Sequence, residues 1–394
     1  MSGSGAPSEG SYALTSAKAG TVAAPVLAYR PPRPKQYNPK IALVGAGGIS
    51  FAHLDAYRKA GYDVAAICGR TLEKAEARRD EFFPDAAATS DFEALLARDD
   101  IAVFDITTHP AERVALMERA LAAGKHVLSQ KPFALDLDTG LRLADLADKR
   151  RVKLAVNQNG RWAPHLAWMR EAVRTGLIGE ITSCHVSVHW DHQWIKGTPF
   201  DEIDDLIFFD FAIHWFDFLT SLIGSRAKSV FATRSRAFGQ EARPPLLAQA
   251  LIEFDGGQAS LAFDAATRFG AQDRTFITGT KGTLFSIGPN LGEQKVQLTT
   301  AAGVAEPELS GTWFNDGFHG AMGELLCAVE EGCEPLNGAR GNLDSLALAF
   351  AAIASSHRNE PVRPGSVRSP ADAGQSEIDT SGAREKNAAS GSPR

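Results

Sequence analysis

Residues 41–50 read IALVGAGGIS, an apolar run that ends in closely spaced glycines. The apolar residues predict a strand, and Gly45, Gly47 and Ser50 form the pattern G-x-G-x-x-S where a helix begins. A first glycine permits a tight turn, and a second lets a pyrophosphate approach the helix N-terminus. Ser50 replaces a third small residue that allows close helix–strand packing. The stretch predicts a dinucleotide-binding turn, with cofactor contacts from Gly45, Gly47, Gly48, Ile49 and Ser50.

The segments that follow alternate between short apolar runs and helix-like stretches. The expected strands are 41–47, 64–68, 101–107 and 126–132, and the expected helices are 50–59, 72–83 and 113–124. This alternation is typical of βαβ units in a parallel, doubly wound sheet. Beyond residue 180, consecutive strand-like runs separated by turn residues predict a mostly antiparallel sheet. We therefore expect an α/β Rossmann domain over 39–157 and an α+β domain over 158–363.

Composition limits the class of protein. The chain has 394 residues, a formal net charge of −6, 44% apolar residues and 22% charged residues. These values exclude a wholly disordered chain and suit two globular domains. The mild acidity argues against nucleic acid as a ligand, and no run approaches the roughly 20 apolar residues that span a membrane. Four cysteines without zinc-type spacing are too few for a disulfide framework, and no secretory signal opens the chain, so we expect a cytoplasmic protein.

Both ends of the chain differ from the middle. Residues 1–38 are rich in Ala, Pro, Ser and Gly, which predicts a flexible N-terminal arm. The alternative is an arm that wraps a neighbouring subunit, with Tyr29 and Tyr37 as anchors. Residues 364–394 are polar and aperiodic, and we expect them to be disordered.

The end of the second strand bears on the choice between NAD and NADP. An acidic residue there holds the adenosine ribose, whereas a basic residue accepts a 2′-phosphate. This chain has Cys68-Gly69-Arg70-Thr71, with no carboxylate. Arg70 and Thr71 therefore favour NADP weakly over NAD, unless Arg70 only stacks on the adenine.

Two further stretches carry groups suited to acid–base chemistry. Lys131 follows a strand, at the sheet edge where ligands of open α/β folds bind. Asp210 and His214 lie four apart in an apolar, helix-like run, which places both on one helical face, and Asp217 continues that face. A lone histidine in such a run is usually a core residue, but two flanking carboxylates favour a functional role.

Together these stretches resemble the Gfo/Idh/MocA family of oxidoreductases, named after glucose–fructose oxidoreductase and inositol dehydrogenase. The matching pieces are 44–50, 120–135, 157–181 and 210–224. The resemblance implies a Rossmann domain before a large, mostly antiparallel sheet, and NAD(P)-dependent oxidation or reduction of a sugar or cyclitol hydroxyl. It also implies that the lysine of a Glu-Lys-Pro motif falls on Lys131, and the catalytic aspartate and histidine on Asp210 and His214. Further cofactor contacts implied are Thr107, Thr108, His109, Lys131 and Gln158.

The residue types suit that chemistry. His214 is a base with an ordinary pKa near working pH, Lys131 would favour a developing alkoxide, and Asp210 would orient the imidazole or bind a hydroxyl. There are departures from the family pattern: Gln130 stands where the family has Glu, and the loop from Thr107 to Pro110 differs from its usual Thr-Pro form.

Candidate substrate residues cluster after residue 160. Indole rings cover the apolar faces of a sugar while imidazoles bond its hydroxyls. The substrate candidates are Arg161, Trp162, His189, Trp190, His192, Trp194, Asp210, His214, Trp313 and His319. A structural loop is the alternative for residues 190–194. Three nearby histidines invite a metal site, but no cysteine or acidic cluster completes one, so no metal is predicted.

We therefore expect an NAD(P)-dependent dehydrogenase of a sugar, sugar derivative or cyclitol, which forms a homodimer or homotetramer through its half-covered sheet. It is expected to bind neither nucleic acid nor membrane. One alternative is an enzyme whose tightly bound cofactor serves as an internal redox relay, as in sugar–sugar oxidoreductases or redox-assisted glycosidases. Another is a non-catalytic nucleotide-sensing protein.

Overall fold

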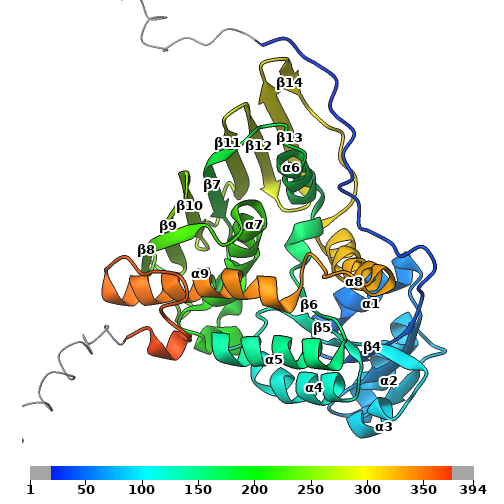
Figure 1. Ribbon diagram of the computed structural model, residues 1–394. Coiled ribbons are helices and arrows are strands. Elements are labelled where there is room, and N and C mark those ends of the chain that lie inside the picture. Colours follow the sequence, from blue (N-terminus) through cyan, green and yellow to red (C-terminus); the bar gives the residue numbers. More distant parts are fainter. Residues whose placement is uncertain (1–18, 375–394) are drawn as a thin grey trace, which may run out of the picture.

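The computed structural model describes residues 19–374 and contains two β-sheets with helices packed around and between them (Figure 1). The first sheet has six parallel strands in the order β3-β2-β1-β4-β5-β6. Its strands are β1 (Lys40–Val44), β2 (Val64–Cys68), β3 (Ala87–Thr89), β4 (Ile101–Ile106), β5 (His126–Gln130) and β6 (Leu154–Asn157). The helices between them are α1 (Ser50–Ala60), α2 (Leu72–Phe82), α3 (Phe92–Leu96), α4 (Pro110–Ala122) and α5 (Leu137–Arg150). This order confirms the predicted Rossmann topology.

The strands of this sheet are buried on both faces, which explains their nearly continuous apolar sequences. Part of the cover comes from the C-terminal half of the chain: α8 (Trp313–Glu331) packs on α1, and α9 (Ala339–Arg358) packs on α5 (Figure 1). The close approach of α8 to Trp162 requires glycine at residue 320, where a Cβ would lie 2.1 Å from Cγ of Trp162. Two helices from the expected second domain thus help to cover the parallel sheet of the first domain.

The second sheet has eight strands in the order β14-β13-β12-β11-β7-β10-β9-β8. Only β7 and β10 pair in parallel, so the prediction of a mostly antiparallel sheet is confirmed. Its strands are β7 (Ile181–His189), β8 (Ala227–Ser235), β9 (Leu247–Phe254), β10 (Gly257–Asp264), β11 (Gln272–Gly279), β12 (Gly282–Asn290), β13 (Glu293–Thr300) and β14 (Gly303–Ala305).

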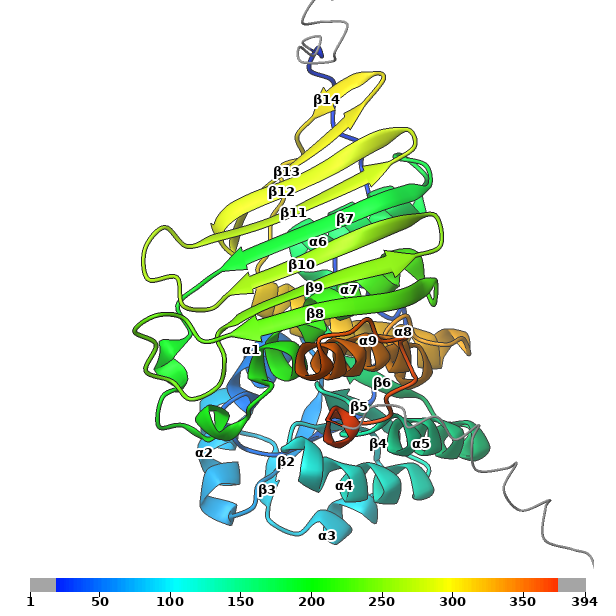
Figure 2. The ribbon, with the colours of Figure 1, turned by 90° about the vertical axis from the view of Figure 1, so that its left-hand side faces the viewer.

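The two faces of this sheet differ. Helices α6 (Pro164–Arg174), α7 (Ile213–Ile223) and α9 lie on its inner face (Figure 1). No helix of residues 19–374 covers the outer face, which is turned to the viewer in Figure 2. Phe231, Leu251 and Phe276 stand on that face and are 37%, 58% and 39% exposed. Short helical turns fill the connections: η2 (Asn159–Trp162), η3 (Gln193–Ile195), η4 (Pro199–Glu202), η5 (Ile207–Phe211) and η6 (Pro370–Asp372).

The described part of the N-terminal segment differs from the flexible arm expected over residues 1–38. Residues 19–38 run along their own chain, from β14 to α8 (Figure 1). The Glu330 carboxylate accepts hydrogen bonds from the backbone N–H groups of Lys35, Gln36 and Tyr37 over 2.6–2.8 Å. These contacts give the extended chain partners that its composition did not indicate. Residues 1–18 lie outside the described part of the chain.

The C-terminal segment also packs in part, although residues 364–394 were expected to be disordered. The backbone N–H of Leu137 donates to the carbonyl of Arg368, and Arg358 donates to the carbonyls of Asp372 and Ala373. Backbone and arginine hydrogen bonds therefore hold residues 364–374 against α5 and α9, and residues 375–394 lie outside the described range.

Over residues 19–374, no helix is both long enough and apolar enough to cross a bilayer. All four cysteines lie within that range, and each is a free thiol.

Candidate active site

The turn between β1 and α1 has the shape that a dinucleotide requires. Gly45 adopts a φ of +113°, and a Cβ there would lie 2.7 Å from Oγ1 of Thr107. In contrast, a Cβ on Gly47 or Gly48 would meet no atom within 4 Å, so the backbone is open to a ligand. The Ser50 hydroxyl donates to the carbonyl of Gly47 over 2.6 Å, and Ile49 is the N-cap of α1. The turn therefore presents a helix N-terminus with no side chain in front of it.

The loop after β4 lies beside this turn. The Thr107 hydroxyl donates to the carbonyl of Gly45 over 2.7 Å, while Oγ1 of Thr108 is buried without a partner. His109 is the N-cap of α4. Buried Arg113 donates to the carbonyls of Thr108 and Pro132, which ties this loop to the one that carries Lys131. Burial lowers the pKa of Arg113 to about 9.

Gln158 follows β6 at the same edge, and both atoms of its side-chain amide are buried without a partner. An unpaired buried amide is costly, and a bound ligand would relieve that cost. The open glycine turn and the unpaired Thr108 and Gln158 therefore fit a bound dinucleotide.

Arg70 and Thr71 lie exposed at the end of β2, where Thr71 is the N-cap of α2. Sequence reasoning missed Arg78, on the next turns of α2, whose guanidinium lies 3.4 Å from the carbonyl of Gly47. Arg70 precedes the N-cap Thr71 of α2, so no helical spacing relates the two arginines and the sequence offered no signal for Arg78. Two arginines thus flank the predicted position of the adenosine end of the cofactor.

Lys131 and Asp210 meet across the boundary between the two sheets. Nζ of Lys131 lies 3.1 Å from Oδ1 of Asp210 and donates to its carbonyl over 2.9 Å. His214 stands one helical turn further on, with Nδ1 buried and unpartnered. Burial first, and the nearby Lys131 cation second, hold the pKa of His214 well below its usual 6.5. The arrangement joins a fixed cation, a carboxylate and a neutral imidazole.

The helix that carries these groups begins irregularly, which sequence reasoning did not foresee. Residues Ile207–Phe211 form a π-helical turn, with the N–H of Ala212 donating to the carbonyl of Ile207 over 2.7 Å, before α7 continues as an α-helix. Such turns alter which side chains share a face. The turn alters the spacing between Asp210 and α7, whereas His214 and Asp217 both lie in the regular helix, three residues apart as the sequence predicted.

Asp217 pairs with Arg161 in the core. Its carboxylate accepts from Nε and Nη2 of Arg161 over 2.6 and 2.9 Å, and also from Asn342 and Ser345. Arg161, predicted to contact substrate, is therefore held by a buried ion pair and is only 8% exposed.

Beneath Lys131 lies a buried polar network that sequence reasoning missed. Nδ1 of His53 lies 2.7 Å from Asp105, which also accepts from the Tyr57 hydroxyl over 2.7 Å. Nε2 of His53 lies 3.0 Å from the Gln130 side-chain nitrogen, and Gln130 Oε1 accepts from the backbone N–H of Lys131 over 2.7 Å. An aspartate inside the apolar run IAVFDI (101–106) was the available signal.

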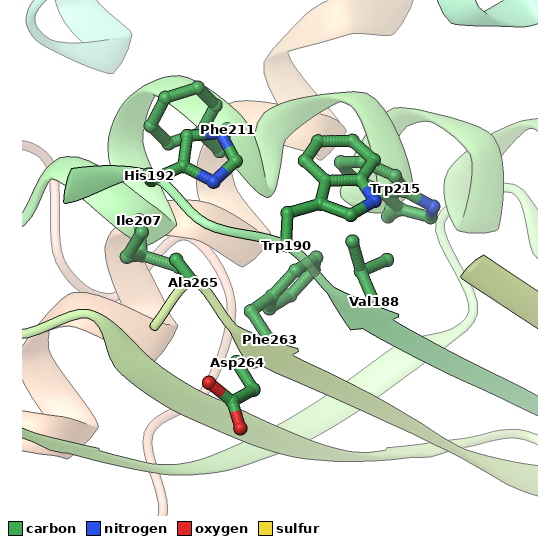
Figure 3. Close-up of a pocket in the computed structure, with 9 residues that line it drawn as sticks. All are labelled: Val188, Trp190, His192, Ile207, Phe211, Trp215, Phe263, Asp264 and Ala265. Carbon is green, nitrogen blue, oxygen red and sulfur yellow. The ribbon is translucent and has the colours of Figure 1, made fainter. Parts of the chain in front are cut away.

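An aromatic pocket is lined by Trp190, His192 and Trp215 (Figure 3), and the ring of His214 lies 6.3 Å from that of Trp215. Trp190 stacks on His192, with ring centroids 5.3 Å apart, and Trp215 lies 5.7 Å from Trp190. Trp313 lies 5.6 Å from His214 and 6.0 Å from Trp215. Trp190 and His192 thus line the pocket and Trp313 packs against Trp215 and His214, and their contact with substrate stays a prediction. Trp194 stands at the rim, 57% exposed, with its ring 6.1 Å from His192.

Three other substrate candidates lie elsewhere. Trp162 is buried under Arg170 and against Gly320, in the contact between α8 and η2. His319 packs against Tyr62, 5.5 Å away, on the Rossmann side of α8. His189 projects from the outer face of β7, where it bonds Ser187 over 2.7 Å. Helical and strand periodicity turns each of these side chains away from the pocket.

Among the described residues, one cluster has metal-ligand chemistry: Asp204, Asp205 and His357. Nη1 of Arg234 lies 2.9 Å from the Asp204 carboxylate and 2.6 Å from that of Asp205, so a cation of the chain already neutralises the cluster. The absence of a metal stays a prediction.

The comparisons with known proteins agree with this geometry. Residues 39–158 match the model of the oxidoreductase family with an NAD-binding Rossmann fold, and residues 166–285 match the GFO/IDH/MocA C-terminal domain. Fold and site together define a two-domain, NAD-binding oxidoreductase. The chain belongs to the GFO/IDH/MocA family, which confirms the resemblance drawn from its motifs.

Curated relatives include an inositol 2-dehydrogenase of Rhizobium meliloti, 26% identical over 80% of this chain and 96% of the relative. A D-apiose dehydrogenase of Paraburkholderia graminis is 27% identical over 85% of this chain and 92% of its own. Similar solved structures include an oxidoreductase from Agrobacterium radiobacter in complex with NAD+, L-tartaric acid and magnesium. The two structures align with a TM-score of 0.76 and 23% sequence identity, and the alignment covers 83% of this chain and 99% of that one.

Proposed function

We propose that this protein transfers hydride between a nicotinamide cofactor and a hydroxyl or carbonyl carbon of a sugar, sugar derivative or cyclitol. The observation that carries the proposal is the contact of Lys131 with Asp210 beside His214, at the same sheet edge as the glycine turn. The names of the inositol and apiose dehydrogenases support this substrate class. When bound, the nicotinamide accepts or returns the hydride.

The proposed roles follow from the contacts of each side chain. His214, kept neutral by burial and by Lys131, takes the hydroxyl proton of the substrate during oxidation. Lys131, fixed by Asp210, donates to the reacting oxygen and stabilises the negative charge that develops there. Asp210 is assigned to holding Lys131 rather than to orienting the imidazole, because its recorded partner is the lysine.

Cofactor contacts are proposed from the open turn at Gly47 and Gly48, from Thr108, and from Gln158. The choice of NADP over NAD is proposed from Arg70, with Arg78 as a second cation on the same side. Arg70 is exposed, and Arg78 holds exposed Glu81 and the carbonyl of Gly47, so both cations lie on the side where a 2′-phosphate would bind.

The remaining expectations are proposals as well. The outer face of the second sheet, which no described helix covers and which exposes Phe231, Leu251 and Phe276, supports a homodimer or a homotetramer built through it. Four free thiols and a formal net charge of −6 support a cytoplasmic enzyme that binds neither nucleic acid nor membrane.

The test is nicotinamide absorbance at 340 nm when purified protein is mixed with NAD or NADP and a panel of sugars, glycosides, anhydrosugars and inositols. We expect reduction of the cofactor with at least one substrate class, and its loss in Lys131→Ala and His214→Ala while both variants still bind cofactor. Cofactor that copurifies and never exchanges, with no turnover across the panel, would contradict the proposal and favour an internal redox relay.

A further inference from the structure

Three buried polar side chains on the inner face of the second sheet lack any hydrogen-bond partner among the described residues. Asp273 and Thr275 lie two apart on β11, and Ser286 lies directly opposite Thr275 on β12. All three are 0% exposed, and both carboxylate oxygens and both hydroxyls are unpaired. Buried polar groups are nearly always hydrogen-bonded, because leaving them unpaired costs folding free energy. Three adjacent exceptions point to a ligand that completes them.

Strand pairing places this cluster beside the pocket at the active site. Asp273 pairs with Val188 of β7, and Val188 lines the aromatic pocket together with Trp215 (Figure 3). Trp215 directly follows His214, and both side chains lie within 6.0 Å of Trp313 by ring centroid. Asp273 therefore lies one strand from Val188 in the pocket wall, and Thr275 and Ser286 follow it along β11 and across to β12.

The cluster of unpaired polar groups extends one strand further, to β13. Gly288 pairs with Asp273, and the side-chain nitrogen of Gln294 would lie 2.8 Å from a Cβ on that glycine. Oε1 of Gln294 is buried and unpaired too. A fourth acceptor thus stands at the end of the same cluster.

The chemistry of the cluster selects hydroxyl groups. A carboxyl, two hydroxyls and an amide oxygen can each exchange hydrogen bonds with hydroxyls, which both donate and accept. Burial raises the pKa of Asp273 to about 7, which reflects the absence of a cation beside it.

Three cations near the active site are already engaged. Lys131 pairs with Asp210 and Arg161 pairs with Asp217. Arg113 donates to backbone carbonyls. An anionic group in the pocket would therefore find no free positive charge among these three side chains, and it would face the Asp273 carboxyl.

We propose that Asp273, Thr275 and Ser286 form a substrate subsite that binds the hydroxyl groups remote from the reacting carbon and selects uncharged polyols over phosphorylated or acidic sugars. This inference rests on the proposed function, which it narrows to neutral sugars and cyclitols.

The experiment compares Thr275→Val and Ser286→Ala with the wild type, using the neutral substrate that the panel turns over fastest. Each variant removes one hydroxyl and keeps the side-chain volume nearly unchanged. We expect the substrate KM to rise about tenfold in each variant, since one hydrogen bond to a buried partner is lost, while kcat and the cofactor KM change by less than about twofold. The wild type should use glucuronate, glucose 6-phosphate and inositol monophosphate at least about 100-fold less well than their neutral counterparts, by kcat/KM.

Ser235→Ala, at the exposed end of β8, is the matched control and should leave every constant unchanged. Thermal unfolding of each variant verifies the fold. Unchanged substrate KM in both inner-face variants, or equal use of the anionic sugars, would overturn the subsite while the dehydrogenase assignment stands. Failure of the wild type to turn over any sugar or cyclitol would contradict the proposed function itself, and the subsite would fall with it.

Discussion

The side-chain amide of Gln130 donates a hydrogen bond to Nε2 of His53 over 3.0 Å, and this bond fixes where the histidine carries its proton. The amide orientation follows from its other end, because Oε1 accepts from the backbone N–H of Lys131. An amide nitrogen only donates, so Nε2 must accept, and the proton lies on Nδ1, facing Asp105 over 2.7 Å. His53 is therefore neutral, and it connects Asp105 to the backbone of the proposed catalytic lysine.

Gln130→Glu restores the residue that the family motif carries and should change the charge of His53. A carboxylate cannot donate, so Nε2 would have to carry a proton, which makes the ring an imidazolium between two carboxylates. We expect the ¹⁵N shifts of the His53 ring to report the neutral Nδ1–H form in the wild type and the doubly protonated form in the variant at neutral pH. An imidazolium in the wild type would show that the amide is reversed.

The pH dependence of alcohol oxidation should follow the lowered pKa of His214. Burial and the Lys131 cation both disfavour the charged ring, so the neutral base persists below its ordinary pKa of 6.5. We expect kcat/KM for oxidation to stay level as the pH falls through 6.5 and to drop only at a lower pH. The measurement is an initial-rate profile with a buffer series of constant ionic strength. A half-maximal point at 6.5 or above would contradict the geometry.

The sequence predicted the fold well because its signals are local. The run IALV and the glycines that follow it carry their own periodicity and turn chemistry, and the alternation after them determines a parallel sheet. Lys131 was placed correctly at the sheet edge for the same reason, since the end of a strand is visible in the chain.

The orientation of side chains could not be predicted in the same way on the irregular turn before α7 or on α8, which packs between the two domains. The π-helical turn lies at Asp210, before the regular helix α7 that carries His214 and Asp217, and no periodicity in the apolar run announces it. Trp313 and His319 were both substrate candidates and both lie on α8, but His319 packs against Tyr62 on the Rossmann side whereas Trp313 lies beside His214. Asp273 was not among the candidates drawn from the sequence, because burial of that face depends on helices distant in the chain.

Breaking the ion pair of Arg161 with Asp217 should destabilise the protein strongly. Asp217→Asn leaves a buried guanidinium without its counter-charge, and such losses amount to about 3–5 kcal/mol. We expect a clear fall in the denaturant midpoint. As a first control, Glu241→Gln breaks an exposed pair with Lys196 and should change the midpoint little. As a second, the double variant Arg161→Met/Asp217→Leu replaces both charges by apolar side chains and should recover part of the lost stability. Equal effects of Asp217→Asn and Glu241→Gln would rule out a structural role for the buried pair.

Arg70 should determine how well the protein distinguishes NADP from NAD. Arg70→Ala removes a charge-assisted bond to the 2′-phosphate, which weakens NADP binding by roughly tenfold and leaves NAD binding nearly unchanged. Both cofactors are titrated into the protein, and binding is followed by quenching of protein fluorescence. Arg78→Ala tests the second cation in the same measurement. Tighter binding of NAD than NADP by the wild type would contradict the proposed preference.

Without substrate, the buried Asp273 carboxyl should make the free energy of unfolding depend on pH in a defined direction. Burial raises its pKa from 3.8 to about 7 in the folded state, so between these values the folded chain holds a proton that the unfolded chain releases. Stability contributed by this group is therefore present below about pH 4 and is lost as the pH rises to about 7, by up to about 4 kcal/mol. Asp273→Asn stays neutral throughout, so the stability of the variant relative to the wild type should increase from pH 5 to pH 8 in denaturant titrations. Parallel curves for the two proteins would show that the carboxyl is already paired in the folded state.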